Sequence, residues 1–275
     1  MPNTHVRTLA IDVGGTGLKA TVLDAAGVPE HERVRVATTY PCPPTKLVAD
    51  LVALVQPLPA ADRVSVGFPG VVRGGVVRTA PHFVTVTGPG SSVDPDLERA
   101  WVGFDLAAAL TARLHLPVRV ANDAEVLGLG AIDGIGVELV VTLGTGFGSA
   151  VFRDGALALH LELAHHPLRG KLTYNEVLGD AARKKVGNKK WCRRVAATIP
   201  VLDALITPDS ILIGGGNAAR LDLTKLNLTK LGSADLAAKV RLIDNEAGLL
   251  GGIRLWADAA VSATSTPTVE SPPGT

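Results

Sequence analysis

The strongest constraint on the fold of this chain is a local pattern that its sequence contains twice. Thr8-Leu-Ala-Ile-Asp12 is a short apolar segment that leads into the glycine loop at 13–17, after which residues 19–23 are mostly apolar again. Val137–Leu143 leads in the same way into a Gly/Thr loop at 144–149 and then into a second apolar segment. Each copy indicates a strand, a loop and another strand. The shared order predicts an internal duplication with two related halves.

Predicted strands and helices alternate along both halves. Helical spacing occurs at 47–54, 106–114, 124–131 and 246–256, and further short apolar segments lie at 64–68, 118–121 and 211–213. This alternation predicts an α/β protein with helices packed on its sheets. We place an N-terminal domain at 1–117 and a C-terminal domain at 118–258, with the closing helix able to pack back on the N-terminal domain. Residues 259–275 are dominated by Ser, Thr, Pro and Gly, which predicts a disordered tail.

The composition excludes several classes of protein. Apolar residues make up 47% and charged residues 19%, with 27 basic against 26 acidic side chains, which argues against a disordered chain or a general nucleic-acid binder. Two cysteines, Cys42 and Cys192, cannot form a disulfide framework or a four-cysteine zinc site. No uncharged apolar run approaches the roughly 20 residues of a membrane helix, and no secretory signal is visible. We therefore expect a soluble cytoplasmic protein without nucleic-acid or membrane partners.

Glycine is concentrated in loops that follow the predicted strands. The candidate loop residues are Gly14, Gly15, Thr16, Gly17 and Lys19 in the first loop, Gly144, Thr145 and Gly146 in the second, and Gly214, Gly215 and Gly216 in a third. Tight glycine turns expose consecutive backbone N–H groups that can bind phosphate, and Asp12 can hold Mg²⁺ directly or through water. One such loop is equally well explained as a hairpin turn. Three such loops after three strands favour phosphate binding.

Asn122 and Asp123 follow an apolar segment and precede a predicted helix. Asn and Asp are good helix caps, and a carboxylate at the carboxyl end of a strand can also act as general base on a substrate hydroxyl. The spacing alone favours neither interpretation. Glu162, His165 and His166 lie close together further along the chain. Without further ligands at suitable spacing, these three residues indicate a solvated helix end or loop rather than a metal site.

Six motifs together resemble those of a known family. They are Leu9 to Lys19, Phe68-Pro69-Gly70, Val120 to Ala124, Leu143 to Gly148, Glu162-Leu-Ala-His165 and Ile213 to Gly216. In this order they are similar to the motifs of the ROK (repressor, open reading frame, kinase) family of sugar kinases. The resemblance extends from about Thr8 to Trp256. It is closest to the polyphosphate-glucokinase branch, because of Phe-Pro-Gly-Val-Val, Leu-Gly-Thr-Gly-Phe-Gly-Ser and Asn245-Glu-Ala-Gly248.

This resemblance implies an actin-like ATPase fold, with ribonuclease H-like halves around a deep cleft. It implies a hexose kinase that uses ATP or inorganic polyphosphate, with Mg²⁺, to phosphorylate typically the 6-hydroxyl of glucose. Asp123 matches the family's catalytic base. The residues that match sugar contacts of the family are Gly70, Asn122, Asp123, Glu162, His165 and, with Asn175 as the alternative, Glu176. The three glycine loops match its phosphate and nucleotide contacts, and a homodimer is expected from the resemblance alone.

The sequence departs from the family pattern at three places. Ala164 replaces a glycine beside the sugar and restricts the backbone there. If Asn175 rather than Glu176 aligns with the second sugar-binding glutamate, a charged acceptor is lost. The cysteine-rich zinc motif is missing, so we predict no zinc site and a sugar-binding role for His165. These departures leave a sugar-binding regulator or a degenerate kinase as the alternative function. An ATPase of the actin or chaperone type shares the phosphate loops but leaves the sugar motifs without a role.

Seven basic residues lie between positions 183 and 194 with no acidic residue among them. They are Arg183, Lys184, Lys185, Lys189, Lys190, Arg193 and Arg194. Apolar residues at helical spacing, from Trp191 to Ile206, indicate that this basic cluster is the solvated face of a helix, which Pro200 would kink or break. The alternative is a track for polyphosphate along Lys184, Lys185, Lys189, Lys190, Arg193 and Arg194. Without the cluster the chain has 27 − 7 = 20 basic against 26 acidic side chains, so its positive charge is local.

Overall fold

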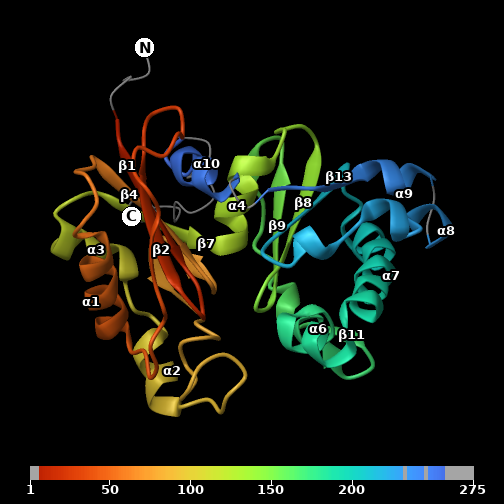
Figure 1. Ribbon diagram of the computed structural model, residues 1–275, viewed down its shortest axis with the longest axis horizontal. Helices are drawn as coiled ribbons and strands as arrows, with labels where there is room; N and C mark the ends of the chain where they lie inside the picture. Colours follow the sequence, from red (N-terminus) through yellow and green to blue (C-terminus); the bar gives the residue numbers. More distant parts are fainter. Residues whose placement is uncertain (1–5, 232–233, 245–246, 258–275) are drawn as a thin grey trace, which may run out of the picture.

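A computed structural model describes residues 6–231, 234–244 and 247–257 of the chain. Within these residues the chain forms two five-stranded sheets. Figure 1 shows the two sheets on either side of helix α4 (Asp123–Ala131). The first sheet contains β1 (Thr8–Val13), β2 (Leu18–Leu23), β3 (Val34–Val36), β4 (Arg63–Phe68) and β7 (Val118–Asn122). The second contains β8 (Val137–Leu143), β9 (Phe147–Arg153), β10 (Ala156–Leu157), β13 (Ser210–Gly214) and β14 (Val240–Leu242). Four short strands form two separate hairpins, β5 (Val72–Arg73) with β6 (Val76–Val77) and β11 (Pro167–Arg169) with β12 (Leu172–Thr173).

The two sheets have the same strand order around their centres. The first has the order β3-β2-β1-β4-β7, in which β1 is antiparallel to β2 and parallel to β4. The second has the order β10-β9-β8-β13-β14, in which β8 is antiparallel to β9 and parallel to β13. The repeated strand, loop and strand therefore form an equivalent hairpin in each sheet. This topology confirms the predicted α/β fold with two related halves.

Helices pack on the sheets and enclose a separate apolar core in each half. The helices of the first half are α1 (Pro44–Val55), α2 (Pro95–Trp101) and α3 (Leu106–Leu114), and those of the second are α5 (Tyr174–Leu178), α6 (Asp180–Val186), α7 (Asn188–Ile206), α8 (Leu228–Leu231) and α9 (Ala234–Lys239). Pro44 opens α1, where its missing N–H leaves no bond unmade, and Leu47 and Leu51 are fully buried one turn apart. Trp101 and Trp191 are fully buried in the two cores.

Two further helices, α4 (Asp123–Ala131) and α10 (Ala247–Arg254), lie between the sheets, where Figure 1 shows them side by side. They approach closely because glycines meet at the crossing. A Cβ atom on Gly251 would overlap the carbonyl oxygen of Val126, and one on Gly130 would overlap that of Ala247. Gly252 of α10 lies against β1 and β4 of the first sheet, and its carbonyl accepts a hydrogen bond from Ser65. The closing helix therefore packs back on the first half.

The division of the chain between the halves differs in one strand from the sequence boundary. We placed the boundary between residues 117 and 118, yet β7 pairs with β4 in the first sheet. The division into two domains itself stays a proposal. The predicted tail at 259–275 lies outside the described residues, as do Asn245 and Glu246, the second of which begins the predicted closing helix.

The helix that carries much of the basic cluster is not broken at its proline. Pro200 lies inside α7, which continues to Ile206, so the expected break is absent from the described chain. Val195 and Ile199 before the proline and Leu202 after it are all buried in the same core. This packing holds both parts of the helix in place, although Pro200 has no N–H to donate a backbone hydrogen bond.

Among the residues that the structure describes, no helix combines the length and apolar character that crossing a membrane requires.

Candidate active site

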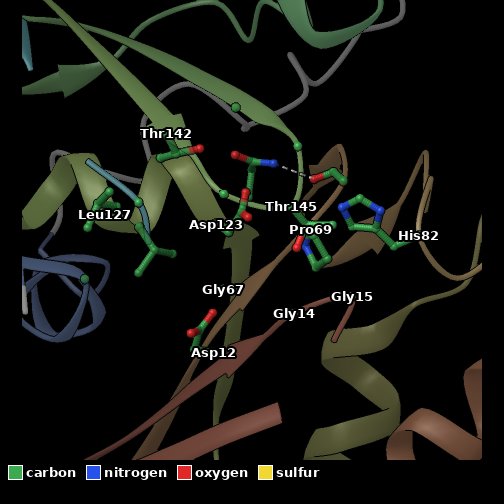
Figure 2. A pocket seen from close by; sticks show the side chains of 18 of the residues that line it. Asp12, Gly14, Gly15, Gly67, Pro69, His82, Asp123, Leu127, Thr142 and Thr145 are labelled. Atoms are coloured by element: carbon green, nitrogen blue, oxygen red, sulfur yellow. Dashed lines mark hydrogen bonds between the residues drawn. The ribbon is translucent and has the colours of Figure 1, made fainter. Parts of the chain in front are cut away.

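A cavity of about 380 Å³ lies between the two halves, and residues from both line it (Figure 2). The first half contributes the loop after β1, the end of β4 and the start of α4. The second half contributes the loops after β8 and β13 and the segment around residues 160–165. Figure 2 shows Asp12, Asp123 and Thr145 around the same space. Because the two halves share one topology, their equivalent hairpin loops meet at this cavity.

All three predicted phosphate loops contribute residues to the cavity wall. The lining residues among them are Asp12, Gly14, Gly15, Lys19, Gly144, Thr145, Gly146, Gly215 and Gly216. The two hairpin loops close alike: the N–H of Gly14 donates to the Gly17 carbonyl at 3.0 Å, and that of Gly144 donates to the Gly146 carbonyl at 2.9 Å. Thr16, Gly17 and Gly214, which we also expected here, are not among the lining residues.

Asn122 and Asp123 occupy the junction of β7 and α4. The Asn122 side chain accepts from the N–H of Ala124 at 2.9 Å, which is the predicted helix cap. Its amide nitrogen also donates to the carbonyl of Gly70 at 3.0 Å, so the cap is tied to the Pro69-Gly70 loop. The helix-cap interpretation is therefore confirmed for Asn122, and both Asn122 and Asp123 line the cavity.

The environment of Asp123 favours the protonated carboxyl group. Removal from water raises its pKa, the negative charges of Asp12, Glu162 and Glu125 raise it further, and the hydrogen bond from the Ala124 N–H lowers it, with a resulting value of about 7. A carboxylate whose pKa lies near neutrality is suited to accept a proton in a reaction at physiological pH. Such a shift in a cleft is typical of functional sites.

Asp12 is an exposed carboxylate on the cavity wall. Its side chain forms an ion pair with Lys19 at 2.8 Å across the hairpin. No group of three or more His, Cys, Asp or Glu residues that could hold a metal ion exists within the described chain. Mg²⁺ in kinases usually takes one or two carboxylates and completes its shell with water and substrate phosphates. Asp12 beside two glycine loops fits that kind of incomplete site.

The predicted sugar contacts divide into residues inside and outside the cavity. Gly70, Glu162 and His165 line it, as does Ala164. Glu176 does not: its carboxylate accepts hydrogen bonds from the N–H and hydroxyl of Thr173 in the capping box of α5. The alternative residue, Asn175, does line the cavity and accepts from the Phe147 N–H at 2.6 Å. Neighbouring residues of a helix point in different directions, and here Asn175 faces the cavity while the Glu176 carboxylate stays in the capping box.

The basic cluster lies outside the cavity wall and is only partly free. Arg183 and Lys184 form ion pairs with Asp180, and Arg194 donates to the carbonyl of Val177. Lys185, Lys189, Lys190 and Arg193 are exposed and have no ion-pair partner in the described chain. Asp180 also links the cluster to the second glycine loop, since its N–H donates to the carbonyl of Thr145.

The sequence patterns did not predict three side chains at or beside the site, which are those of His82, Glu125 and His160. His82 lines the cavity near Gly15 and His165, and its pKa is lowered by burial and by the charge of His165. His160 contacts Glu125 and Glu162. The capping-box spacing between Asn122 and Glu125 was the available signal for Glu125. For His160 a signal was its position two residues before Glu162.

Two duplicated α/β halves around a cavity define the actin-like ATPase fold. Within it the chain belongs to the ROK family, whose sequence model matches residues 8–166. The chain is 28% identical over 228 residues to a polyphosphate glucokinase of Mycobacterium tuberculosis, which covers 80% of this chain and 81% of the relative.

Solved structures resemble the chain over most of its length. The crystal structure of inorganic polyphosphate/ATP-glucomannokinase from Arthrobacter sp. strain KM is 29% identical, has a TM-score of 0.73, and covers 90% of this chain and 97% of its own. A ROK family glucokinase from Streptomyces griseus, solved with glucose and AMPPNP, has a TM-score of 0.69 at 19% identity and covers 90% of this chain and 98% of its own. This second likeness concerns the fold.

Proposed function

We propose that this protein is a hexose kinase that transfers a phosphoryl group from polyphosphate, ATP or both to the 6-hydroxyl of glucose or a related hexose. The observation that carries the proposal is the position of Asp123, a carboxyl group with a pKa of about 7 in a cavity that it shares with three glycine loops. The names of the relatives, polyphosphate glucokinase and polyphosphate/ATP-glucomannokinase, support the same acceptor and donors.

In this proposal Asp123 is the general base. Its ionised carboxylate accepts the proton of the sugar hydroxyl while the oxygen attacks the terminal phosphorus of the donor. The bond from that phosphorus to the bridging oxygen breaks, and ADP or the shortened polyphosphate leaves. Glu162 and His165 bind the other hydroxyl groups from the opposite half. Asn122 positions the Pro69-Gly70 loop beside the sugar through its bond to the Gly70 carbonyl. Phosphoryl transfer needs little covalent chemistry from the protein, so these residues act mainly by positioning the reactants.

The glycine loops bind the phosphates of the donor. Their backbone N–H groups and the Thr145 hydroxyl provide donors for phosphate oxygens, and Lys19 provides a positive charge. Asp12 would hold Mg²⁺, which neutralises charge on the transferring phosphates when bound. Because the loops belong to different halves, closure of the halves around both substrates would exclude water and suppress hydrolysis of the donor.

The exposed part of the basic cluster is a candidate track for a long polyphosphate chain. Lys185, Lys189, Lys190 and Arg193 supply its charge, and Asp180 connects α6 to the loop that contains Thr145. Arg194 contributes less, because it donates to a backbone carbonyl. A polyanion on such a track would show a steep dependence on salt concentration.

An assay of phosphate transfer to a panel of hexoses, with ATP and with polyphosphate as donors, tests the proposed function. We expect transfer that requires a hexose, with glucose among the acceptors. Hexose binding without transfer would instead identify the chain as a sugar-binding regulator, an alternative that Ala164 and Asn175 favour. Donor hydrolysis that no hexose stimulates would indicate an ATPase. The cytoplasmic location and the homodimer remain predictions.

A further inference from the structure

His160 lies between two carboxylates on the wall of the cavity. Its Nδ1 is 2.8 Å from Oε1 of Glu125, and its Nε2 is 3.3 Å from Oε2 of Glu162. The His160 side chain is 13% exposed and that of Glu125 is 6% exposed, whereas that of Glu162 is 33% exposed. Ionised carboxylates only accept hydrogen bonds, so the ring satisfies both only as the imidazolium, with a proton on each nitrogen.

The contact with Glu125 fixes one end of this arrangement. Glu125 is on α4, and its other oxygen accepts from the backbone N–H of Asn122 at 3.1 Å. Asn122 immediately precedes Asp123, so the carboxylate that anchors His160 also belongs to the cap that orients the proposed base. His160 is therefore anchored to the capped first turn of α4.

The second contact joins Nε2 of His160 to the Glu162 carboxylate, and the position of that carboxylate depends on it. Within the described part of the chain, the Glu162 carboxylate forms no other hydrogen bond. A partly exposed glutamate side chain without such a contact samples many rotamers, and a ligand that needs one of them must restrict it on binding.

We propose that His160 is a positioning residue that holds the Glu162 carboxylate in place for the sugar and thereby sets the affinity for the hexose. The inference rests on the proposed function, in which Glu162 binds a sugar hydroxyl. His160 itself acts through Glu162. A positioning role of this kind affects KM for the hexose more than kcat, because the contact is made in the ground state as well as in the transition state.

The protonation of His160 supports this role. Its hydrogen bonds to Glu125 and Glu162 raise its pKa, burial lowers it, and the charges of the same two carboxylates raise it, to about 9. The charged groups that the structure sets against the ring are Glu125 from α4 and Glu162 from its own segment. Above pH 9 the neutral ring can donate only one hydrogen bond, which the nearer Glu125 retains. We expect KM for the hexose to rise there.

Two substitutions separate the two contacts. The amide of Asn reaches the position of Nδ1, and the amide of Gln reaches that of Nε2, so His160→Asn keeps the donor to Glu125 and His160→Gln keeps the donor to Glu162. We expect His160→Asn to raise KM for glucose about tenfold, the effect of one lost charge-assisted hydrogen bond, with kcat within about twofold. His160→Gln should raise KM by no more than about threefold. His166→Asn is the matched control, since His166 does not line the cavity and the one hydrogen bond of its side chain in the described chain is to the Pro167 carbonyl.

Glucose binding by calorimetry accompanies the kinetics and does not require turnover. The melting temperature gives an independent check, because His160→Gln removes the donor to Oε1 of buried Glu125, leaves it only the Asn122 N–H, and should be the less stable variant. Equal KM values for His160→Asn and His160→Gln, or an unchanged KM in His160→Asn, would overturn the inference while the wild type remains active. A wild type that neither binds nor phosphorylates any hexose would refute the proposed function, and the role of His160 with it. If the Gln variant does not fold, a wild-type dissociation constant for glucose in His160→Asn still refutes the inference.

Discussion

The proton affinity of Asp123 makes a quantitative prediction for the pH dependence of phosphoryl transfer. A general base must be ionised to accept the proton of the sugar hydroxyl. Burial, together with the charges of Asp12, Glu162 and Glu125, raises the pKa of Asp123 to about 7, compared with 3.8 for an unperturbed aspartate. Activity is therefore lost as the pH falls through about 7, where an ordinary aspartate would still be fully ionised.

The size of the effect follows from the titration of one group. One pH unit below its pKa, a group is about nine-tenths protonated, so kcat/KM at pH 6 should be roughly a tenth of its plateau value above pH 8. At pH 5 it should be roughly a hundredth. An aspartate with a pKa of 3.8 would lose less than about 1% of its ionised form at pH 6, so the two cases differ about tenfold there.

The assay measures initial rates of hexose phosphate formation from pH 5 to 9 at constant ionic strength. Quenched samples are analysed after neutralisation, so that no coupling enzyme limits the rate at low pH. Enzyme returned from each pH to pH 8 must recover its full activity, which controls for unfolding. A plateau of kcat/KM that extends down to pH 5 would refute the assignment of Asp123 as a base with a raised pKa.

Three further predictions concern stability and the donor. Between about pH 4 and 7 the folded protein holds a proton on Asp123 that the unfolded chain releases, so the free energy of unfolding falls as the pH rises. Asp123→Asn should therefore have a free energy of unfolding about 1–3 kcal/mol above that of the wild type at pH 8. A series of denaturation curves at different pH values should show this gain vanish near pH 4. Gly251→Ala should lower the free energy of unfolding by about 2–3 kcal/mol, because the added Cβ overlaps a backbone carbonyl. The control Gly248→Ala is on the same helix, and its Cβ meets Leu127 at an ordinary 3.6 Å, so it should leave the free energy of unfolding unchanged. Equal losses in the two variants would exclude the close crossing of the helices. Between 50 and 200 mM salt, kcat/KM for polyphosphate should fall roughly tenfold more than kcat/KM for ATP. Replacing Lys189 and Lys190 by Gln should reduce this difference in salt dependence between the two donors. Equal salt effects on both donors would argue against the polyphosphate track.

The fold could be predicted from the sequence because its two halves repeat one pattern. The strand and loop at Asp12 and the strand and loop at Gly144 form equivalent hairpins, and apolar periodicity located helices α1, α3, α4, α7 and α10 around them. The course of α7 through Pro200 could not be predicted in this way. A prediction from local sequence considers only the backbone hydrogen bond that is lost at the proline. In the folded protein, buried residues on both sides of Pro200 stabilise the helix through tertiary contacts.

The candidate site was predictable where a residue type signals its own chemistry. Glycine loops and the pair Asn122 and Asp123 are of this kind, and they line one cavity or cap its helix. The choice between Asn175 and Glu176 depends on the direction of a helix of five residues, which spacing does not define. His160 was not found, because its importance depends on Glu125, 35 residues earlier in the chain.

The most direct test of the account compares hexose binding and phosphoryl transfer in Asp123→Asn. Asparagine keeps an oxygen that can accept from the Ala124 N–H, but it has no negative charge and cannot take up a proton. We predict a dissociation constant for glucose within about threefold of the wild type by calorimetry, and a loss of kcat of about 10²–10⁴-fold with either donor. Near-wild-type turnover by a variant that binds glucose normally would contradict the central claim that Asp123 is the base of a hexose kinase.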